Sequence, residues 1–307
     1  MGAGHIMNQR IIAGLTYILV ILSLAGAAFT GSLRQEEIKP VNRLMVLFTD
    51  FGRESYRVPN LKGIIYSAND EARVVDGTHE ITPFDVREGA FLLYLAAKDF
   101  PENVVFIGIV APGDPLEERR IVVRTGKGQI FVGPDNGLFT HVIRNFEVEL
   151  VHQITNQDMF AKPVSSSLIS PIVGRVGALV ASGYAVKDVG PPVDDPHTFD
   201  LEDAIIVGSK MAGEIVLIDH FGNCVTNIPG NMAEEFGLEL GDEVIISAGG
   251  GVKVEAMFGR TYGDVPQGKP VVFVNSLDLM ELAINMGNFA NFQRISTGMK
   301  TEIEIKR

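Results

Sequence analysis

Asp50 is the first residue of the chain whose type and position suit ligand binding. It follows five consecutive apolar residues, 44–48, and Thr49, and it precedes Phe51 and Gly52. Such an apolar run predicts a strand covered on both faces of a sheet, and open α/β sheets bind ligands beyond the carboxyl ends of their strands. A carboxylate there accepts hydrogen bonds, and the two adjacent hydroxyls of a ribose are a fitting partner. The competing interpretation is a turn-forming or helix-capping aspartate, which is common at such positions.

Three further stretches combine polar residues with glycine or proline. They read Asp-Gly-Thr-His-Glu-Ile-Thr-Pro-Phe-Asp-Val at 76–86, Gly-Pro-Asp-Asn-Gly-Leu at 133–138 and Ile-Asp-His-Phe-Gly-Asn-Cys-Val-Thr-Asn-Ile at 218–228. In this order and spacing, and together with Thr-Asp-Phe-Gly at 49–52, they resemble the S-adenosylmethionine hydroxide adenosyltransferases. These are the S-adenosylmethionine hydrolases related to fluorinase and chlorinase. The resemblance extends from about residue 44 to the C-terminus.

The resemblance implies both a fold and a reaction. The implied fold is an N-terminal α/β domain, with a mostly parallel sheet and flanking helices, followed by a small β-barrel domain. The implied assembly is a homotrimer whose active sites lie between the first domain of one subunit and the second domain of its neighbour. The family's reaction is substitution at the 5′ carbon of S-adenosylmethionine, where methionine is already a good neutral leaving group, so alignment and desolvation suffice. We therefore expect neither a metal nor a cofactor.

The resemblance also assigns ligand contacts, residue by residue. Asp50 corresponds to the aspartate that binds the ribose, and Phe84 to an aromatic residue that packs on the nucleoside. The remaining contacts divide between the methionine end, which falls to Asp219, Phe221, Asn223 and Ser276, and the adenine edge, which falls to Asn285 and the backbone of Met286.

Several of these residues also have ordinary structural interpretations. Phe84 is of a type that fills cores, Asn223 suits a turn, and Ser276 suits the cap of a helix beginning near Leu277. His79 is expected to fix its own turn through hydrogen bonds to the backbone. Singly, each structural interpretation is favoured; as an ordered set, the residues favour a binding site.

The water-handling residues of the family are only partly kept. In the hydrolases an aspartate, an arginine and a histidine orient the attacking water. Here the aspartate position is Ala111, the histidine position is Leu168, and the arginine is kept as Arg119. Asp114 could return a carboxylate to the site, although the acidic run 114–118 is more typical of a solvated loop. We expect hydrolysis of S-adenosylmethionine to adenosine and L-methionine to be impaired or altered, because losing an acid/base group costs about 10²- to 10⁴-fold in rate.

Two alternatives to a hydrolase stay open. One is an exported, catalytically silent protein that binds S-adenosylmethionine or a related nucleoside. The other is a halide-using adenosyltransferase, because replacing the charged aspartate and histidine leaves a more apolar nucleophile site with Arg119 available to an anion.

Composition and patterning indicate the elements that must position these residues. The 307 residues carry a net charge of −12 and one cysteine, Cys224. The charge argues against a nucleic-acid partner, and one cysteine excludes an internal disulfide and a thiolate zinc cluster, so we interpret Cys224 as a structural thiol. Alternating apolar runs and helical segments predict an α/β domain at 43–190, proline and aspartate indicate a linker at 191–203, and short strands with glycine turns predict a β-barrel at 204–307.

The N-terminal residues 1–35 are expected to lie outside the fold. Arg10 precedes an apolar run at 11–29 that contains the small residues Ala25, Gly26 and Ala27. This pattern is typical of a signal peptide, and the run is almost long enough for an N-terminal membrane anchor. Either interpretation predicts an exported protein, periplasmic or extracellular, or membrane-anchored and facing outward.

Overall fold

The apolar strands of the N-terminal domain form a six-stranded mixed sheet. The computed structural model describes residues 43–111, 119–160, 169–248 and 252–306. The strand order is β2(Arg73–Thr78), β1(Leu44–Thr49), β3(Val105–Ile109), β5(Ile130–Pro134), β4(Arg120–Thr125) and β6(Val148–Gln153). The first four strands run parallel, and β4 runs antiparallel to both of its neighbours. The predicted α/β class with a mostly parallel sheet is confirmed.

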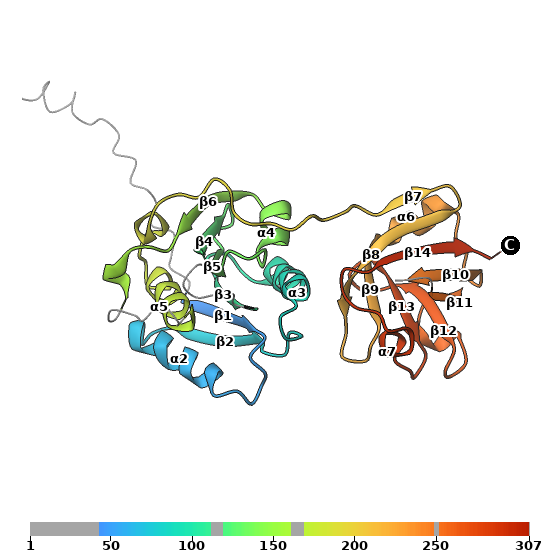
Figure 1. Cartoon of the computed structure of the whole chain (residues 1–307), viewed down its shortest axis with the longest axis horizontal. Helices are drawn as coiled ribbons and strands as arrows, with labels where there is room; N and C mark the ends of the chain where they lie inside the picture. The colour runs from blue at the N-terminus through green and yellow to red at the C-terminus, as the bar shows by residue number, and fades with distance from the viewer. Residues whose placement is uncertain (1–42, 112–118, 161–168, 249–251, 307) are drawn as a thin grey trace, which may run out of the picture. The chain divides into compact units, whose positions relative to one another are not determined.

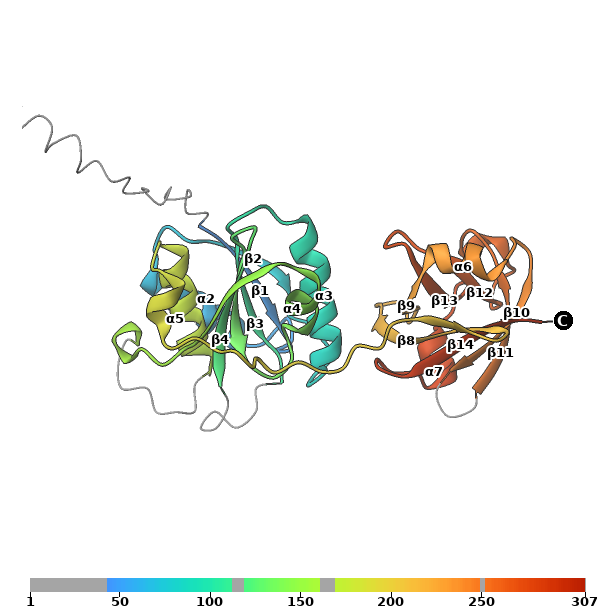
Figure 2. The same cartoon turned by 90° about the horizontal axis from the view of Figure 1, so that it is seen from above.

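Helices cover both faces of this sheet (Figures 1 and 2). The helices α2(Arg57–Ala68) and α5(Ile169–Ala181) lie on one face, and α3(Val86–Asp99) and α4(Thr140–Asn145) lie on the other. Alternate residues of β1 serve the two sides: Met45 and Leu47 pack in the core with α2 and α5, whereas Val46 and Phe48 pack in the core with α3. Because both faces are buried, the strand reads as an unbroken apolar run.

The parallel arrangement brings three loops to one edge of the sheet. β1, β2 and β3 are adjacent and point the same way, so the segments that follow Thr49, Thr78 and Ile109 begin at a common carboxyl edge. Asp50, Phe84 and Ala111 belong to these three segments. The topology therefore gathers residues that are up to about sixty positions apart in the sequence.

The C-terminal domain is a closed barrel of seven strands. Around the barrel the order is β14(Lys300–Ile305), β10(Glu243–Ala248), β11(Val252–Phe258), β12(Pro270–Val274), β13(Leu279–Ile284), β9(Cys224–Pro229) and β8(Lys210–Ile218), and β14 pairs with β8 to close it. The short β7(Ile205–Val207) pairs with β8. The helices α6(Gly230–Phe236) and α7(Phe289–Gln293) lie within the same domain. The predicted β-barrel is confirmed.

Short 3₁₀ turns complete the description: η1(Gln157–Met159), η2(Val186–Val189) and η3(Tyr262–Asp264). The helix considered near Leu277 is absent from the described residues there. Instead, residues 275–278 form the turn between β12 and β13, where the N–H of Asp278 donates to the carbonyl of Asn275 at 3.0 Å. The side chain of Asn275 also accepts from the backbone N–H of Leu277, so an asparagine-centred turn competes successfully with a helix start.

The N-terminal expectation lies outside the described residues. Within the part of the chain that the structure describes, no helix is both long and apolar enough to cross a bilayer. The signal peptide or anchor at 1–35 stays a prediction.

Candidate functional site

Asp50 lies directly after β1, at the carboxyl edge of the sheet, and is half-buried. Its Oδ2 accepts hydrogen bonds from the backbone N–H of Phe84 at 3.1 Å and of Ala111 at 3.0 Å. One carboxylate oxygen thus ties together the three loops that meet at this edge. Among the described residues, Oδ1 accepts no hydrogen bond, so a second acceptor oxygen stays available to a ligand hydroxyl.

Phe84 is held away from the core at a strained backbone position. Its side chain is 79% exposed and its φ angle is +70°. A left-handed conformation in a bulky residue costs about 1–3 kcal/mol and persists only where neighbouring contacts impose it. Here these contacts are the Asp50 carboxylate and the N-terminal cap of α3, in which Asp85 accepts from the backbone N–H of Glu88 at 2.9 Å. The core-filling interpretation of Phe84 is therefore wrong.

Three side chains support the turn that carries Asp50. The buried ring of His79 lies with Nδ1 2.9 Å from Oγ1 of Thr49 and with Nε2 3.0 Å from a carboxylate oxygen of Asp76. Lys62 donates to the other carboxylate oxygen of Asp76 at 2.7 Å. The carbonyl of His79 also accepts from the N–H of Gly52 at 2.7 Å. His79 thus fixes this region through side chains as well as through the backbone, which the sequence interpretation did not include.

The expected catalytic residues are only partly described. Ala111 has a φ angle of +43°, donates its N–H to Asp50, and offers no acid or base. Arg119 is held by two carboxylates: Nε lies 2.5 Å from Oδ2 of Asp135, and Nη1 donates to Oδ1 of Asp195 at 3.0 Å. The contact with Asp195 connects Arg119 to the linker. Asp114 and Leu168 lie outside the described residues.

The second half of the expected site is a turn between β8 and β9 in the barrel. Oδ1 of Asp219 accepts from the backbone N–H groups of Phe221 at 2.9 Å and Asn223 at 2.8 Å. Oδ2 accepts from Nδ2 of Asn223 at 2.8 Å. The Phe221 ring is 72% exposed, whereas Asn223 is only 4% exposed. The turn is thus internally bonded and carries an aromatic ring on its outside, with Gly222 at a φ angle of +84° against the side chain of Asn288.

A hydrogen-bond network that joins this turn to β13 was not predicted from the sequence. Nδ2 of Asn223 donates to the hydroxyl of Tyr262 at 3.3 Å, and that hydroxyl donates to Oε1 of Glu281 at 2.7 Å. Oε2 of Glu281 accepts from Nδ2 of Asn275 at 2.9 Å. Glu281 is 5% exposed, although it stands among apolar residues in β13. That single acidic residue in an apolar strand was the only signal of the network in the sequence.

The remaining predicted residues lie at other corners of the barrel. Ser276 is exposed at the tip of the turn between β12 and β13. Asn285 donates through Nδ2 to the carbonyl of Val265 at 2.7 Å. Met286 follows it with a φ angle of +57° and a side chain that is 83% exposed. Asn275 bonds to Glu281 of the network, whereas Asn285 bonds to Val265, the residue that follows η3.

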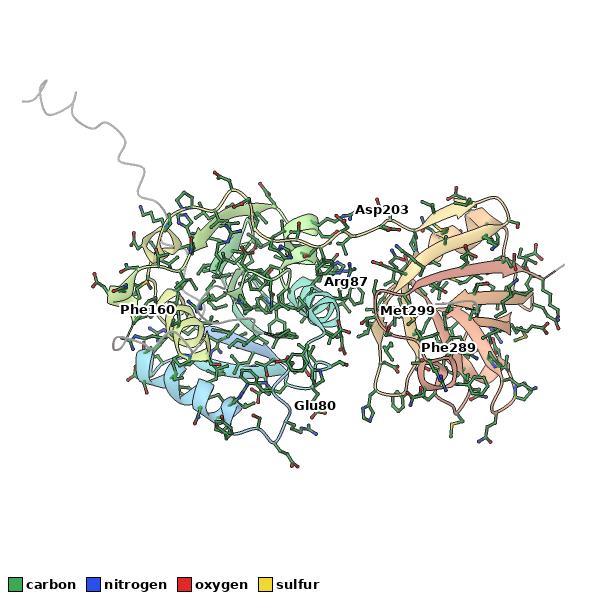
Figure 3. All side chains as sticks on the ribbon, viewed as in Figure 1. Glu80, Arg87, Phe160, Asp203, Phe289 and Met299 are labelled. Atoms are coloured by element: carbon green, nitrogen blue, oxygen red, sulfur yellow. The ribbon has the colours of Figure 1, made fainter. Side chains whose placement is uncertain are left out.

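A cleft of about 1160 Å³ is lined by residues from both domains. The α/β domain contributes Lys62, Asp76 and the segment 77–80, whose Glu80 is labelled in Figure 3. The barrel contributes 217–220, Gly222 and parts of α7. Of the predicted ligand residues, Asp219 lines this cleft; Asp50, Phe84 and Asn285 do not. The predicted ligand residues therefore fall into two groups, one at the edge of the sheet and one in the barrel, and Asp219 is the member named above that lines the cleft.

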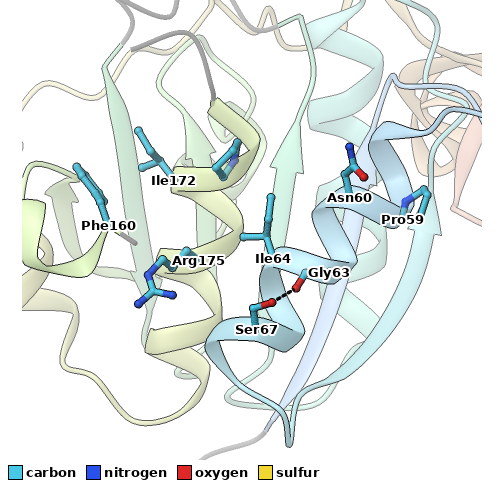
Figure 4. Close-up of a pocket in the computed structure, with 9 residues that line it drawn as sticks. Pro59, Asn60, Gly63, Ile64, Ser67, Phe160, Ile172 and Arg175 are labelled. Carbon is cyan, nitrogen blue, oxygen red and sulfur yellow. Dashed lines mark hydrogen bonds between the residues drawn. The ribbon is translucent and has the colours of Figure 1, made fainter. Parts of the chain in front are cut away.

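A second hollow of about 490 Å³ lies between α2 and α5 (Figure 4). Among the described residues that line it, Ile64, Phe160 and Ile172 are apolar and only Arg175 is charged. Arg175 donates through Nε to the carbonyl of Met159 at 2.8 Å. None of the predicted ligand residues lines it. It plays no part in the site that follows from Asp50.

Two observations limit the chemistry of the described residues. They contain no group of three or more His, Cys, Asp or Glu side chains that could hold a metal. Cys224 is fully buried, and burial, together with the charges of Asp219 and Glu281, raises the pKa of its thiol to about 12. The thiol is therefore protonated at neutral pH, as a structural cysteine would be.

Comparison with known families gives matches over both domains. Residues 45–190 match the model of the SAM hydroxide adenosyltransferase N-terminal domain, and residues 213–302 match that of the C-terminal domain. The two ranges contain both half-sites described above.

Individual relatives agree with these matches. The (R)-S-adenosyl-L-methionine hydrolase of Salinispora tropica is 30% identical over 260 residues, which cover 83% of this chain and 95% of the relative. A fluorinase of an Actinoplanes species is 25% identical over 290 residues, covering 85% and 97%. An uncharacterized conserved protein of Thermotoga maritima has a crystal structure that superposes with a TM-score of 0.78 at 30% identity, covering 84% of this chain and 99% of that one.

Proposed function

The chain belongs to the SAM hydroxide adenosyltransferase family, and from this premise we propose that it binds S-adenosylmethionine and hydrolyses it slowly to adenosine and L-methionine. The observation that carries the proposal is the Asp50 carboxylate. It stands at the carboxyl edge of a mostly parallel sheet, where such folds bind ligands, and it keeps one oxygen free among the described residues. A ribose with two adjacent hydroxyls fits this acceptor.

Each predicted residue is assigned to one part of the ligand. Phe84 supplies an exposed ring for the nucleoside, positioned by the backbone bond to Asp50. Asp219 supplies a carboxylate for the positively charged amino group of the methionine tail, with Phe221 beside it. The adenine edge is assigned to Asn285 and the backbone of Met286. A few convergent polar groups and flat apolar surfaces are what a nucleoside with a charged tail requires.

In-line attack at the 5′ carbon needs an aligned nucleophile and little else from the protein. The sulfonium leaves as a neutral thioether, so no group has to protonate it. Alignment and exclusion of bulk water supply most of the acceleration. Ala111 provides no base for an attacking water, and the guanidinium of Arg119 is bound to Asp135 and Asp195. Slow turnover follows from these two observations.

The same observations favour a second candidate, a catalytically silent binding protein. Its ligand contacts would be identical, and only the nucleophile would be missing. A halide-using enzyme is the third candidate, with Ala111 leaving an apolar place for the anion. The apolar run at 11–29 supports an exported location for any of the three.

The experiment that tests the proposal combines binding with product analysis. Calorimetry of the purified protein with adenosine and with S-adenosylmethionine should detect both ligands. Asp50→Asn keeps an oxygen for the N–H groups of Phe84 and Ala111 but replaces the free acceptor by an amide, so affinity for both ligands should fall at least about 10-fold. The exposed Asp70, in the turn before β2, gives the matched control Asp70→Asn, which should bind normally. Equal adenosine affinity in all three proteins would contradict the proposal.

Product analysis separates the three candidates. Incubation with S-adenosylmethionine in chloride-free buffer should yield adenosine and methionine in the first case and nothing in the second. Formation of a 5′-halogenated nucleoside only when halide is added would identify the third.

A further inference from the structure

We propose that Thr49 and His79 are positioning residues for the ribose hydroxyls, because together they fix the turn that carries Asp50 and so direct its available carboxylate oxygen. This role rests on the proposed function, since it concerns the same contact with the ribose. Neither side chain is placed to touch the ligand: Thr49 is fully buried, and His79 is 7% exposed. Both act through the backbone of residues 49–52.

The hydrogen bonds of the Asp50 side chain place one of its oxygens but not the other. Oδ2 accepts from the N–H groups of Phe84 and Ala111. These two bonds do not set the direction from Oδ2 to Oδ1, which is the oxygen that accepts no hydrogen bond from a described residue. Because the side chain of aspartate is short, that direction depends on where the turn holds the Cα atom. The position of Oδ1 is therefore set by the backbone of the turn.

The turn that follows Asp50 is closed by one hydroxyl and one carbonyl group. The N–H of Phe51 donates to Oγ1 of Thr49 at 3.3 Å, and the N–H of Gly52 donates to the carbonyl oxygen of His79 at 2.7 Å. Gly52 has a φ angle of +83°, which glycine adopts without strain. Both acceptors thus belong to the two residues proposed here.

The ring of His79 keeps the hydroxyl of Thr49 in place. Nδ1 lies 2.9 Å from Oγ1, whereas Nε2 lies 3.0 Å from a carboxylate oxygen of Asp76 in a contact too bent for a regular hydrogen bond. Burial acts to raise the pKa of Asp76, but the contacts with Lys62 and His79 lower it below its ordinary value, so this group is a carboxylate at neutral pH. Its charge favours hydrogen on Nε2 of the neutral ring, which leaves Nδ1 to accept from the Thr49 hydroxyl.

The series Asp76, His79 and Thr49 contains the residue types of a nucleophile triad, but its burial excludes that role. A hydroxyl in a fully buried side chain cannot reach a substrate. The series instead supports the backbone on both sides of Asp50.

This support has a consequence for ligand discrimination. If the turn loosens, ligands that carry the two ribose hydroxyls should bind more weakly, and ligands that lack them should be spared. The nucleoside 2′,3′-dideoxyadenosine lacks both hydroxyls and keeps the adenine base. It is therefore the internal reference for adenosine.

The test compares Thr49→Val, which keeps the branched shape without the hydroxyl, with Thr49→Ser, which keeps the hydroxyl. Calorimetry of the full chain should show that the wild type binds adenosine more tightly than 2′,3′-dideoxyadenosine. In Thr49→Val, adenosine should bind about 10-fold more weakly, as expected when a hydrogen bond to a charged acceptor is displaced, and the dideoxy analogue should change by less than about twofold. Thr49→Ser should restore most of the preference for adenosine.

Two further variants separate positioning from general stability. His79→Leu removes both ring nitrogens and should cause the same selective loss as Thr49→Val. The matched control is Thr125→Val, because Thr125 is also a buried threonine at the end of a strand, and its hydroxyl donates to the carbonyl of Gln129 at 3.4 Å. Since β4 runs antiparallel to β5, this residue lies at the opposite edge of the sheet. Thr125→Val should lose stability and keep the wild-type preference for adenosine.

Several outcomes would overturn the inference. An unchanged preference in Thr49→Val and His79→Leu would show that the turn needs neither side chain, and a loss in Thr49→Ser as large as in Thr49→Val would show that the hydroxyl is not the cause. Equal losses for both nucleosides, or failure of both variants to fold, would show a general structural role. If only one of the two folds, that variant decides.

Failure of the proposed function itself would look different, because it needs no variant. A wild type that binds neither nucleoside, or binds adenosine no better than its dideoxy analogue, would remove the ribose contact of Asp50 and the positioning role with it.

Discussion

At the scale of single residues, the proposed site has a side chain suited to binding the ligand, Asp50, but lacks an acid or base at position 111 to orient the attacking water. Asp50 holds three loops together through one oxygen, yet the neighbouring Ala111, bonded to that same oxygen, has nothing with which to orient a water. The backbone at 111 has a φ angle of +43°. Aspartate tolerates this conformation better than alanine does, because its short polar side chain bonds locally.

Restoring the two side chains that the family has at these positions should therefore increase turnover. Ala111→Asp combined with Leu168→His should raise the rate of S-adenosylmethionine hydrolysis by at least about 10²-fold, and by more than the two single changes together, because groups that act as a unit are non-additive. Affinity for adenosine should change little. Single-turnover assays with product separation measure the rate. The matched control is Ala111→Asn with Leu168→His, which has nearly the same shape but lacks the carboxylate and should stay slow; equal rates in both double variants would contradict the argument.

Residue types were predictable from the sequence more readily than their contacts. Asp50 could be placed because an apolar run ends directly before it. The positive φ angle of Phe84 could not be predicted. It is imposed by contacts with Asp50 and with the cap of α3, and only the fold brings these together. The contacts of Tyr262 could not be predicted for the same reason: its partners Asn223 and Glu281 are 39 and 19 positions away.

At the scale of elements, α3 and α4 form a contact whose stability should depend on pH. His141 of α4 packs its ring against Phe91 and Tyr94 of α3 and against Phe199 of the linker. Burial lowers the pKa of His141 to about 4, and the nearby charges of Arg144 and Arg87 act in the same direction. His141 and Glu214 of β8 line one small pocket, and burial raises the pKa of the Glu214 carboxyl group.

The sign of the effect follows from the two pKa values of His141. An unfolded histidine has a pKa of about 6.5, so between about pH 4 and pH 6.5 the unfolded chain binds more protons at this residue than the folded chain does. The free energy of unfolding should therefore fall as the pH drops through this window, by about 3 kcal/mol at most. Glu214 has the opposite sign, because a raised carboxyl pKa favours the folded state most strongly at low pH.

Replacing His141 isolates its share of this dependence. In His141→Phe, the loss of stability between pH 6.5 and pH 4.5 should be smaller than in the wild type, because no buried ring has to acquire a proton. Urea unfolding at several pH values measures this, with His197→Phe as the control, since His197 is exposed. Parallel pH profiles for the wild type and His141→Phe would show that burial of His141 does not govern acid stability.

The sequence pattern predicts elements that local apolar runs define. It does not predict features that depend on pairing between strands far apart in the sequence. The apolar run at 44–48 predicted β1, Leu44–Thr49, nearly at its observed bounds. Individual barrel strands are harder to predict: Glu281 interrupts the apolar character of β13, and β7 is only three residues long. Closure of the barrel depends on the pairing of β14 with β8, whose residues lie about ninety positions apart, and no local pattern encodes that contact.

At the scale of the whole molecule, the two half-sites raise the question of how many chains make one site. The side chains expected to pack on the ligand are strongly exposed in the single chain: Phe84, Phe221 and Met286 are 79%, 72% and 83% exposed. Large apolar side chains gathered at a predicted site in this state are typical of surfaces that a partner or ligand covers. The trimer predicted from the sequence would supply such a partner. Against it stands the cleft in which Asp219 meets the segment 77–80 of its own chain.

Mixing two inactive variants distinguishes a shared site from a site within one chain. Asp50→Asn removes the ribose acceptor and Asp219→Asn removes the tail carboxylate, so each variant alone should bind S-adenosylmethionine poorly. If sites form between the α/β domain of one subunit and the barrel of the next, trimers assembled from an equal mixture should contain intact sites at about a quarter of the positions, because an intact site needs an unmodified half from each neighbour. Light scattering should show a trimer, and calorimetry of the co-refolded mixture should recover wild-type affinity at about that fraction of sites. If each site lies within one chain, every chain in the mixture carries a defect and no intact site can form. A monomer in light scattering, or a mixture that binds no better than its components, would therefore rule out the shared site and assign the ligand to the cleft within one chain.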